Sequence, residues 1–215
     1  PNDAANHALY FEKKYPYAFF SKDYQTADPN YFAGCIIYSK YPIIDSKRIS
    51  FLNGESLIYA TILKGDDTIR VYTTHLASYR FKQNDFEFHE TPSNDLEVKA
   101  NRSVLRKMKQ AFVERAVQAE IVRAALDQSP YPTIITGDFN DVPSSYTYKT
   151  IKGNLQDAFL KKGFGIGLTF MGLSPTLRID YILADNRWEV KGWESVDENL
   201  SDHHMVFSDL LLKKN

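Results

Sequence analysis

The stretch Thr133-Ile134-Ile135-Thr136-Gly137-Asp138-Phe139-Asn140 decides the fold assignment. Its β-branched run ahead of the glycine predicts a strand over Thr133–Asp138 that is buried on both faces. Residues two apart in a strand point to the same side, so Asp138 and Asn140 are expected to face one site while Phe139 points into the core. A carboxylate beside an amide suits activation of water next to a donor for a phosphoryl oxygen. A turn after a strand, where Asp and Asn are common, explains the same two residues equally well.

Three further segments have the same design, an apolar strand that delivers polar residues at its end. They are Thr73–Leu76, Arg178–Ile182 and Ser201–His204. Strand ends collect active-site residues because the core holds their geometry fixed. His75 closes the first of these strands, and in its protonated form it can hold a phosphate oxygen. A purely structural histidine at a strand end is the alternative.

Asp180 lies within the apolar strand predicted over Arg178–Leu183. A buried carboxylate is costly unless it is paired, and His203 is the expected partner. Such a pair fixes the imidazole tautomer and stabilises the imidazolium. A salt bridge from Asp180 to Arg178, or a backbone cap, is the alternative. Asp202 beside His203 offers a metal-binding oxygen, and His204 is expected to point away from the site.

The remaining pattern predicts a layered α/β or α+β domain. One long helix is predicted over Arg102–Asp127, because apolar residues recur there at three- and four-residue steps. A second helix is predicted over His7–Tyr17, and the polar segment Arg80–Asn101 is interpreted as a surface loop. The other strands are predicted over Ala33–Tyr41, Ser56–Leu63, Ile69–His75 and His204–Leu212.

Composition narrows the class of protein. The 215 residues are 43% hydrophobic and 25% charged with a net charge of −1, values typical of one globular domain and not of a dedicated non-specific nucleic-acid binder. Cys35 is the single cysteine, so no intrachain disulfide can form, and a buried small hydrophobe in a strand is expected there. Phosphate-binding glycine loops, zinc spacings and a nucleophile elbow are absent from the sequence. Hydrolysis by water activated on a hard cation therefore fits best.

The four segments, in this order, resemble the endonuclease/exonuclease/phosphatase superfamily. Gly34 through Ser39-Lys40-Tyr41-Pro42-Ile43 also resembles the early G-x-x-x-x-S-K-x-P-I segment of that superfamily. The resemblance implies an α/β (α+β) four-layer sandwich, in which two mixed β-sheets pack face to face and helices flank them. It also implies that residues 1–215 form a single domain.

Carried over position by position, the resemblance assigns roles to six residues. Asp138 would orient or activate the attacking water, Asn140 would bind a phosphate oxygen, and His75 would contact the scissile phosphate. Asp180 would orient His203, which acts as general base or stabilises the developing charge. The last of the six, Asp202, would bind the divalent metal, Mg²⁺ or alternatively Mn²⁺. Arg115 and Gln118 receive no role, because the surface of the long helix accounts for them.

The chain departs from the family pattern in two places. The Asn that ends the family's first strand and the Gln-Glu pair of its second are not found before the Ser39–Ile43 segment. We therefore expect the N-terminal part of the domain, with one metal ligand, to lie outside this sequence. Met205-Val206 also stands where many relatives have a proline, which changes how the last strand begins and not the chemistry.

Two classes of function are compatible with these residues. The first is a Mg²⁺-dependent phosphodiesterase or nuclease, with a phosphatase or a phospholipase C-like enzyme on a lipid or inositol phosphate as alternative. Tyr79-Arg80-Phe81-Lys82 would suit a nucleic-acid strand or simply anchor a loop, and Phe164–Leu168 would suit a lipid surface or a glycine-rich turn. The second class is a non-catalytic binding domain that kept the fold. A monomer without a protein partner is expected, and the compartment is left open.

Overall fold

The fold comes from a computed structural model that describes residues 11, 13–28, 31–79, 95–171, 177–198 and 200–214, with the backbone alone for 95–101. Its helices are α2 (Asp95–Asp127), α3 (Tyr146–Lys152) and α4 (Ala158–Lys162). Its strands are β1 (Tyr17–Phe20), β2 (Tyr24–Gln25), β3 (Phe32–Ala33), β4 (Ile36–Ser39), β5 (Ile43–Ser50), β6 (Ser56–Lys64), β7 (Asp67–His75), β8 (Thr133–Asp138), β9 (Gln156–Asp157), β10 (Asp180–Ala184), β11 (Trp188–Val196) and β12 (Met205–Leu212).

A six-stranded mixed sheet forms the centre of the molecule, with the strand order β5-β6-β7-β8-β10-β9. β7 and β8 run parallel, and every other pair in this sheet is antiparallel. In this register Asp138 is the partner of both His75 and Asp180. The central strands therefore bring three of the predicted site residues to one edge of the sheet.

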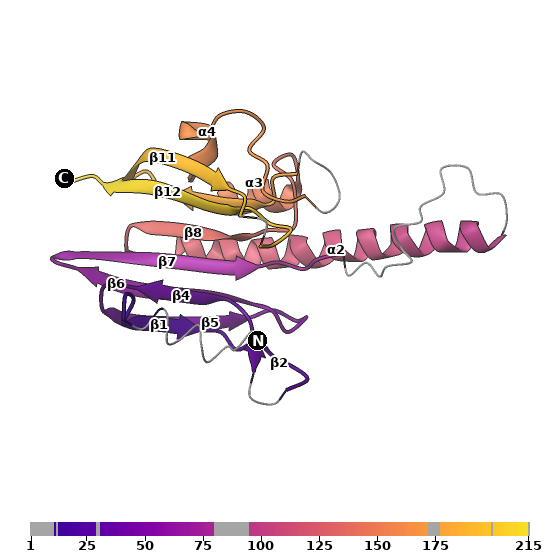
Figure 1. The fold of residues 1–215 in the computed structure, drawn as a ribbon, viewed down its shortest axis with the longest axis horizontal. Coiled ribbons are helices and arrows are strands. Elements are labelled where there is room, and N and C mark those ends of the chain that lie inside the picture. The colour runs from indigo at the N-terminus through magenta and orange to yellow at the C-terminus, as the bar shows by residue number, and fades with distance from the viewer. Residues whose placement is uncertain are drawn as a thin grey trace.

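Each face of this sheet is covered by a different layer (Figure 1). On one face Tyr72, Ile135 and Leu183 pack against buried residues of α2 and α3 such as Val122 and Ile151. On the other face the antiparallel ribbons β1–β4 and β11–β12 pack through two smaller apolar clusters. The chain is thus an α/β sandwich with a mixed sheet between helices and further β-structure, which confirms the predicted fold class.

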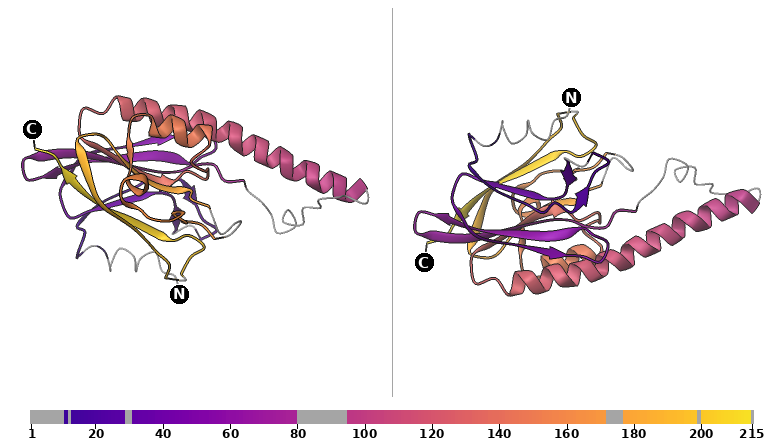
Figure 2. Two further views of the ribbon diagram at one scale, coloured as in Figure 1. Left: turned by 90° about the horizontal axis from the view of Figure 1, so that it is seen from above. Right: turned by 90° about the horizontal axis from the view of Figure 1, so that it is seen from below.

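Helix α2 is longer than predicted and projects beyond the body of the domain (Figures 1 and 2). Its 33 residues make a rod about 50 Å long. The C-terminal half packs on the sheet, and the N-terminal half extends past the edge where β7 ends. The interpretation of Arg80–Asn101 as a loop is wrong for 95–101, whose Leu96, Glu97 and Lys99 are good helix formers. Residues 80–94 lie outside the described part of the chain.

Several predicted helix and strand boundaries differ from those in the structure. Of the helix predicted over His7–Tyr17, residues 7–10 and 12 lie outside the described part of the chain; 13–16 form a turn and irregular backbone instead of a helix, and Tyr17 begins a strand. The strand predicted over Ala33–Tyr41 is interrupted at Gly34, so the half-buried Cys35 precedes β4 instead of lying within a strand. Two long strands, β5 and β11, were not predicted. β5 is mostly exposed, with Asp, Ser, Lys and Arg in its middle, and carries little apolar signal.

Gly137 allows the close approach of β7 to β8. Its φ is +148°, and a Cβ placed on it would lie 2.0 Å from the carbonyl oxygen of Thr74. This oxygen belongs to the backbone of a buried strand, so it cannot move aside as a flexible side chain could. The glycine in the Gly-Asp-x-Asn segment is therefore required by the parallel pairing itself.

We predict that Gly137→Ala lowers the free energy of unfolding by about 3 kcal/mol or more, because the methyl group overpacks a rigid strand pair at a strained φ. Gly65→Ala is the matched control: φ there is +63°, but nothing lies within 4 Å of the added Cβ. That change should cost only about 1–2 kcal/mol. Urea unfolding followed by circular dichroism measures both, and equal losses would contradict the close-approach argument.

Candidate active site

Asp180 and His203 form the pair that the sequence predicted. His203 Nδ1 lies 3.0 Å from Asp180 Oδ2. The alternative partner, Arg178, instead donates to the buried Asp157 at 2.7 Å. Asp180 Oδ2 therefore faces the imidazole, which leaves His203 Nε2 pointing toward Asp138 Oδ2 at 3.9 Å.

The fully buried Thr169 holds the two halves of this pair together. Its hydroxyl oxygen accepts hydrogen bonds from the backbone N–H of Ile179 (3.0 Å) and of Asp180 (3.1 Å). Its carbonyl oxygen accepts from the N–H of His204 at 2.8 Å. Phe170, the residue after Thr169, packs against His203 with the two ring centroids 4.7 Å apart. One threonine thus fixes the backbone on both sides of the dyad.

His204 points away from the site, as expected. Its Nδ1 lies 3.2 Å from Ser195 Oγ, on the neighbouring strand β11. Its Nε2 is 3.8 Å from Asp197. The two adjacent histidines therefore serve opposite sides of the chain, and only His203 reaches the candidate site.

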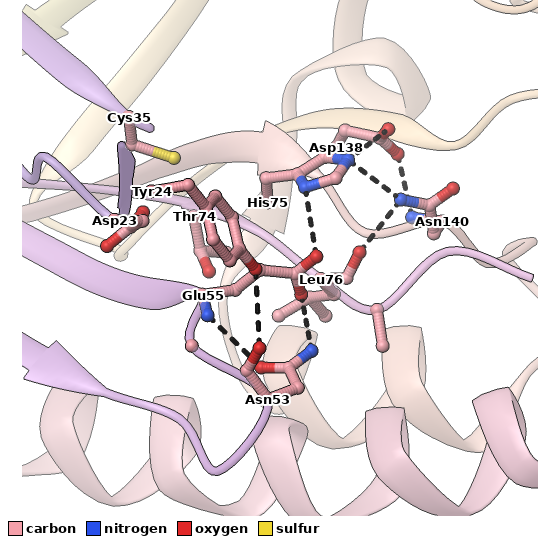
Figure 3. Close-up of polar contacts among 12 residues, drawn as sticks. Asp23, Tyr24, Cys35, Asn53, Glu55, Thr74, His75, Leu76, Asp138 and Asn140 are labelled. Atoms are coloured by element: carbon pink, nitrogen blue, oxygen red, sulfur yellow. Dashed lines mark hydrogen bonds and ion pairs between the residues drawn. The ribbon is translucent and has the colours of Figure 1, made fainter. Parts of the chain in front are cut away.

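Asp138 and Asn140 face the same site, and Phe139 between them is completely buried. These two residues also form the turn that was the alternative explanation. Asn140 adopts a left-handed φ of +51°, and its N–H donates to Asp138 Oδ1 at 2.7 Å. The amide of Asn140 donates to the carbonyl of Leu76 at 2.8 Å and lies 3.2 Å from His75 Nε2 (Figure 3). The turn is what aims the amide at His75.

Glu55 is a member of the site that the sequence analysis missed. Its Oε1 lies 3.6 Å from His75 Nδ1, and its Oε2 accepts from Asn53 at 2.7 Å (Figure 3). It precedes β6, whose start pairs with the end of β7, so it reaches the same sheet edge as His75. A signal was present, because Glu55 is a polar residue directly before a predicted strand. Its significance depended on the antiparallel register.

Charges in the site are tightly coupled. Burial, and then the neighbouring Asp180, raise the pKa of Asp138 from 3.8 to about 6. Hydrogen bonding to Glu55 raises the pKa of His75, and hydrogen bonding to Asp180 raises the pKa of His203. For Glu55, burial acts to raise the pKa, but hydrogen bonds from His75 and Asn53 outweigh it and the pKa is lowered. The site thus holds two imidazoles that favour their charged form and one carboxyl group that lacks a sufficient counter-charge.

A candidate cation site follows from this imbalance. Among the described residues, Asp138, Asp180 and His203 offer ligand atoms that all lie within 4.8 Å of one another. Asp180 is bonded to His203 at 3.0 Å, whereas Oδ2 of Asp138 has longer contacts, 3.6 Å to His75 and 3.9 Å to His203. Carboxylate oxygens are the ligands that Mg²⁺ prefers, and the donor set fits such an ion. Asp202, the metal ligand implied by the resemblance, is exposed beside His203 and does not join the group of three.

The structure therefore brings five of the six predicted site residues together, His75, Asp138, Asn140, Asp180 and His203, and adds Glu55. Arg115 and Gln118 were assigned to a helix surface, and this assignment is wrong. Their exposed fractions are 0% and 4% because they lie on the face of α2 that packs against the sheet.

A family model described as the endonuclease/exonuclease/phosphatase family matches residues 1–203. The chain belongs to this family. Its members hydrolyse phosphoester bonds, and the family generally uses divalent metals. No curated protein matches the sequence.

Solved structures of the family share the fold at low sequence identity. The human nocturnin catalytic domain with bound sulfate is 16% identical with a TM-score of 0.63, over 99% of this chain and 77% of that one. Sphingomyelinase C from Streptomyces griseocarneus is 17% identical with a TM-score of 0.55, over 96% and 78%. A mannosyl-6-phosphatase from Bacteroides thetaiotaomicron is 18% identical with a TM-score of 0.53, over 82% and 70%. At these identities the likeness establishes the fold alone.

The raised pKa of Asp138 predicts that its ionised carboxylate lowers the free energy of unfolding of the metal-free chain. Its folded-state pKa of about 6 lies above its ordinary value of 3.8, so the contribution to stability is present below about pH 4 and is lost as pH rises through 6. In the metal-free chain, Asp138→Asn should therefore increase the free energy of unfolding above pH 6 by about 3 kcal/mol, with no difference near pH 4.

Urea unfolding in EDTA at pH 4, 6 and 8 measures this difference. Added Mg²⁺ should stabilise the parent chain more than the variant and so narrow the gap at pH 8. A variant less stable than the parent at pH 8 in EDTA would show that Asp138 is already well compensated by its histidine neighbours.

Proposed function

We propose that the chain is a Mg²⁺-dependent phosphodiesterase that hydrolyses its substrate with an activated water. The observation that carries this proposal is the pair of histidine–carboxylate couples, Glu55–His75 and Asp180–His203, on either side of Asp138. Cleavage of a phosphodiester needs a proton removed from water and a proton or positive charge supplied near the leaving oxygen. Two oriented imidazoles flanking one carboxylate meet both needs.

Individual roles follow from the contacts. Asp180 fixes the orientation of His203, which accepts the proton of the attacking water or stabilises the charge that develops. Asp138, whose Oδ2 lies 3.9 Å from His203 Nε2, orients that water. His75, favoured as imidazolium by Glu55, donates a hydrogen bond to the phosphoryl group, and the Asn140 amide binds a phosphoryl oxygen. Asp138, together with Asp202 beside His203 in the sequence, would hold Mg²⁺, whose chemistry when bound is to neutralise charge on the phosphoryl oxygens.

A nucleic-acid strand is the diester we propose first. Exposed Arg102, Arg106 and Lys109 follow one another at four- and three-residue steps along one side of the projecting half of α2. A row of cations at helical spacing suits a polyanion that extends past the site. Tyr79, from the segment suggested to bind nucleic acid, instead packs against Arg115 and Phe112 and anchors the chain there. Residues 80–82 of that segment lie outside the described chain.

We predict Mg²⁺-dependent hydrolysis of DNA, RNA or bis-p-nitrophenyl phosphate that EDTA abolishes. His203→Ala and Asp138→Ala should each reduce kcat by about 10³-fold, since each removes a group that handles the proton or orients the water. Asp66→Ala, at an exposed carboxylate in the β6–β7 turn, is the matched control and should retain full activity. Turnover on the nucleic acids should also fall as salt rises.

No turnover on any of these substrates, from a folded chain that does not bind Mg²⁺ by calorimetry, would overturn the enzyme proposal. The alternative of a non-catalytic binding domain would then account for the retained fold.

A lipid phosphodiester is the second candidate, favoured by one surface feature. Phe164 is 97% exposed, and Ile166 and Leu160 are each 62% exposed, next to exposed Lys161 and Lys162. Large exposed apolar side chains with basic neighbours suit an anionic membrane surface. The segment continues directly into Thr169 and the ring that packs on His203.

Sedimentation with vesicles tests this second candidate. The chain should bind phosphatidylcholine vesicles that contain phosphatidylglycerol, and joint Phe164→Ser and Ile166→Ser replacement should weaken binding about 10-fold or more. Leu52→Ser is the matched control, because Leu52 is 100% exposed on the β5–β6 turn. Equal binding by all three proteins, or no binding by the parent, would exclude the lipid surface.

A further inference from the structure

Two buried polar residues of α2, Arg115 and Gln118, hold the segment that follows His75. Gln118 Oε1 accepts the N–H of Ala77 at 2.9 Å, and Arg115 Nη1 donates to the carbonyl of Ala77 at 2.7 Å. Both backbone groups of this one fully buried residue are thus bound by side chains three positions apart on the same helical face. The chain beyond β7 is therefore fixed to α2.

Arg115 ties this segment to a second one. Its Nε donates to Asp141 Oδ2 at 3.2 Å, and Asp141 directly follows Asn140. The guanidinium also lies over the rings of Tyr79 (4.6 Å) and Phe112 (5.0 Å). A fully buried arginine with such neighbours holds its position tightly, because any movement would leave its charge unpaired. The segments bearing His75 and Asn140 are consequently set relative to each other through α2.

Gln118 additionally reaches the candidate site. Its Nε2 donates to Glu55 Oε2 at 3.4 Å, the same oxygen that accepts from Asn53 at 2.7 Å. With Oε2 occupied twice, Oε1 is the oxygen left to face His75 Nδ1 at 3.6 Å. One amide therefore bonds both to the backbone beyond His75 and to the carboxylate that pairs with its ring.

We propose that Gln118 is a positioning residue for the Glu55–His75 pair. It does not touch the substrate; it sets which carboxylate oxygen faces the imidazole and how far the imidazole lies from it. This inference rests on the proposed function, in which His75 contacts the phosphoryl group. It also gives α2 a part in the site, although the group of Asp138, Asp180 and His203 lies on other elements.

Gln118→Met tests the proposal, because methionine keeps the length and loses both hydrogen bonds. We expect kcat to fall about 10- to 100-fold with KM changed about 2-fold or less, since a misplaced pair weakens the transition state more than substrate binding. Gln110→Met is the matched control: Gln110 is exposed on the same helix, and its side chain donates to Glu114 on that helix. It should leave kcat and KM unchanged.

A double-mutant cycle separates positioning from general stability. If Gln118 acts through Glu55, Gln118→Met should have little further effect on kcat in a Glu55→Gln background, while its effect on the melting temperature persists there. The same kcat factor in both backgrounds, or a rise in KM with kcat unchanged, would overturn the proposal. Should Gln118→Met fail to fold, Gln118→Asn replaces it, because the shorter amide cannot reach both partners.

An NMR measurement distinguishes failure of this inference from failure of the proposed function. In the parent chain the Ala77 amide should exchange slowly, and Gln118→Met should accelerate its exchange about 10-fold or more and shift the Glu55 carboxyl and His75 ring signals. If the parent chain shows no turnover but Gln118→Met causes these spectral changes, only the hydrolase proposal is overturned. Unchanged Glu55 and His75 signals in Gln118→Met would overturn the positioning role whatever the activity.

Discussion

The parallel contact of β7 with β8 at Gly137 is the constraint on which the rest of the site depends. The missing side chain lets the Thr74 carbonyl approach, and the resulting register puts His75 beside Asp138. Antiparallel pairing of β10 on the other side of β8 then adds Asp180 at the same level. Three chemically active residues meet because one backbone contact fixes the strands that carry them. Loops bring the others, Asn140 and His203, to a position that already exists.

Support for this arrangement comes from buried polar groups and not from the apolar core alone. Thr169 binds the backbone around Asp180 and His203, and Gln118 with Arg115 binds the backbone beyond His75. Hydrogen bonds among buried groups are directional and costly to leave unmade, so they specify geometry more sharply than apolar packing does. The two histidine–carboxylate couples are thus held by independent elements on opposite sides of β8.

Site residues could be predicted from the sequence where a single segment carried the whole physical signal. Thr133–Asp138 was recognisable as a buried strand, and the strand over Arg178–Leu183 demanded a partner for Asp180, which proved to be His203. Glu55 could not be assigned to the site in the same way, because its position near His75 depends on the register between β6 and β7. Gln118 shares a helical face with the buried Val122, so the periodicity already marked it as core-facing. Polar character alone led to its assignment to the surface.

The electrostatics of the site explain why it invites a cation. Glu55, Asp138 and Asp180 set three carboxylates against two imidazoles, so the group carries one excess negative charge even when both histidines are protonated. Burial places that excess on Asp138, whose pKa rises to about 6. A chain selected for stability alone would replace this carboxylate by an amide, which keeps the acceptor for the Asn140 N–H without the charge. Retaining the acid makes sense when a divalent ion restores the balance, because the same burial that destabilises the metal-free carboxylate strengthens its attraction to a metal.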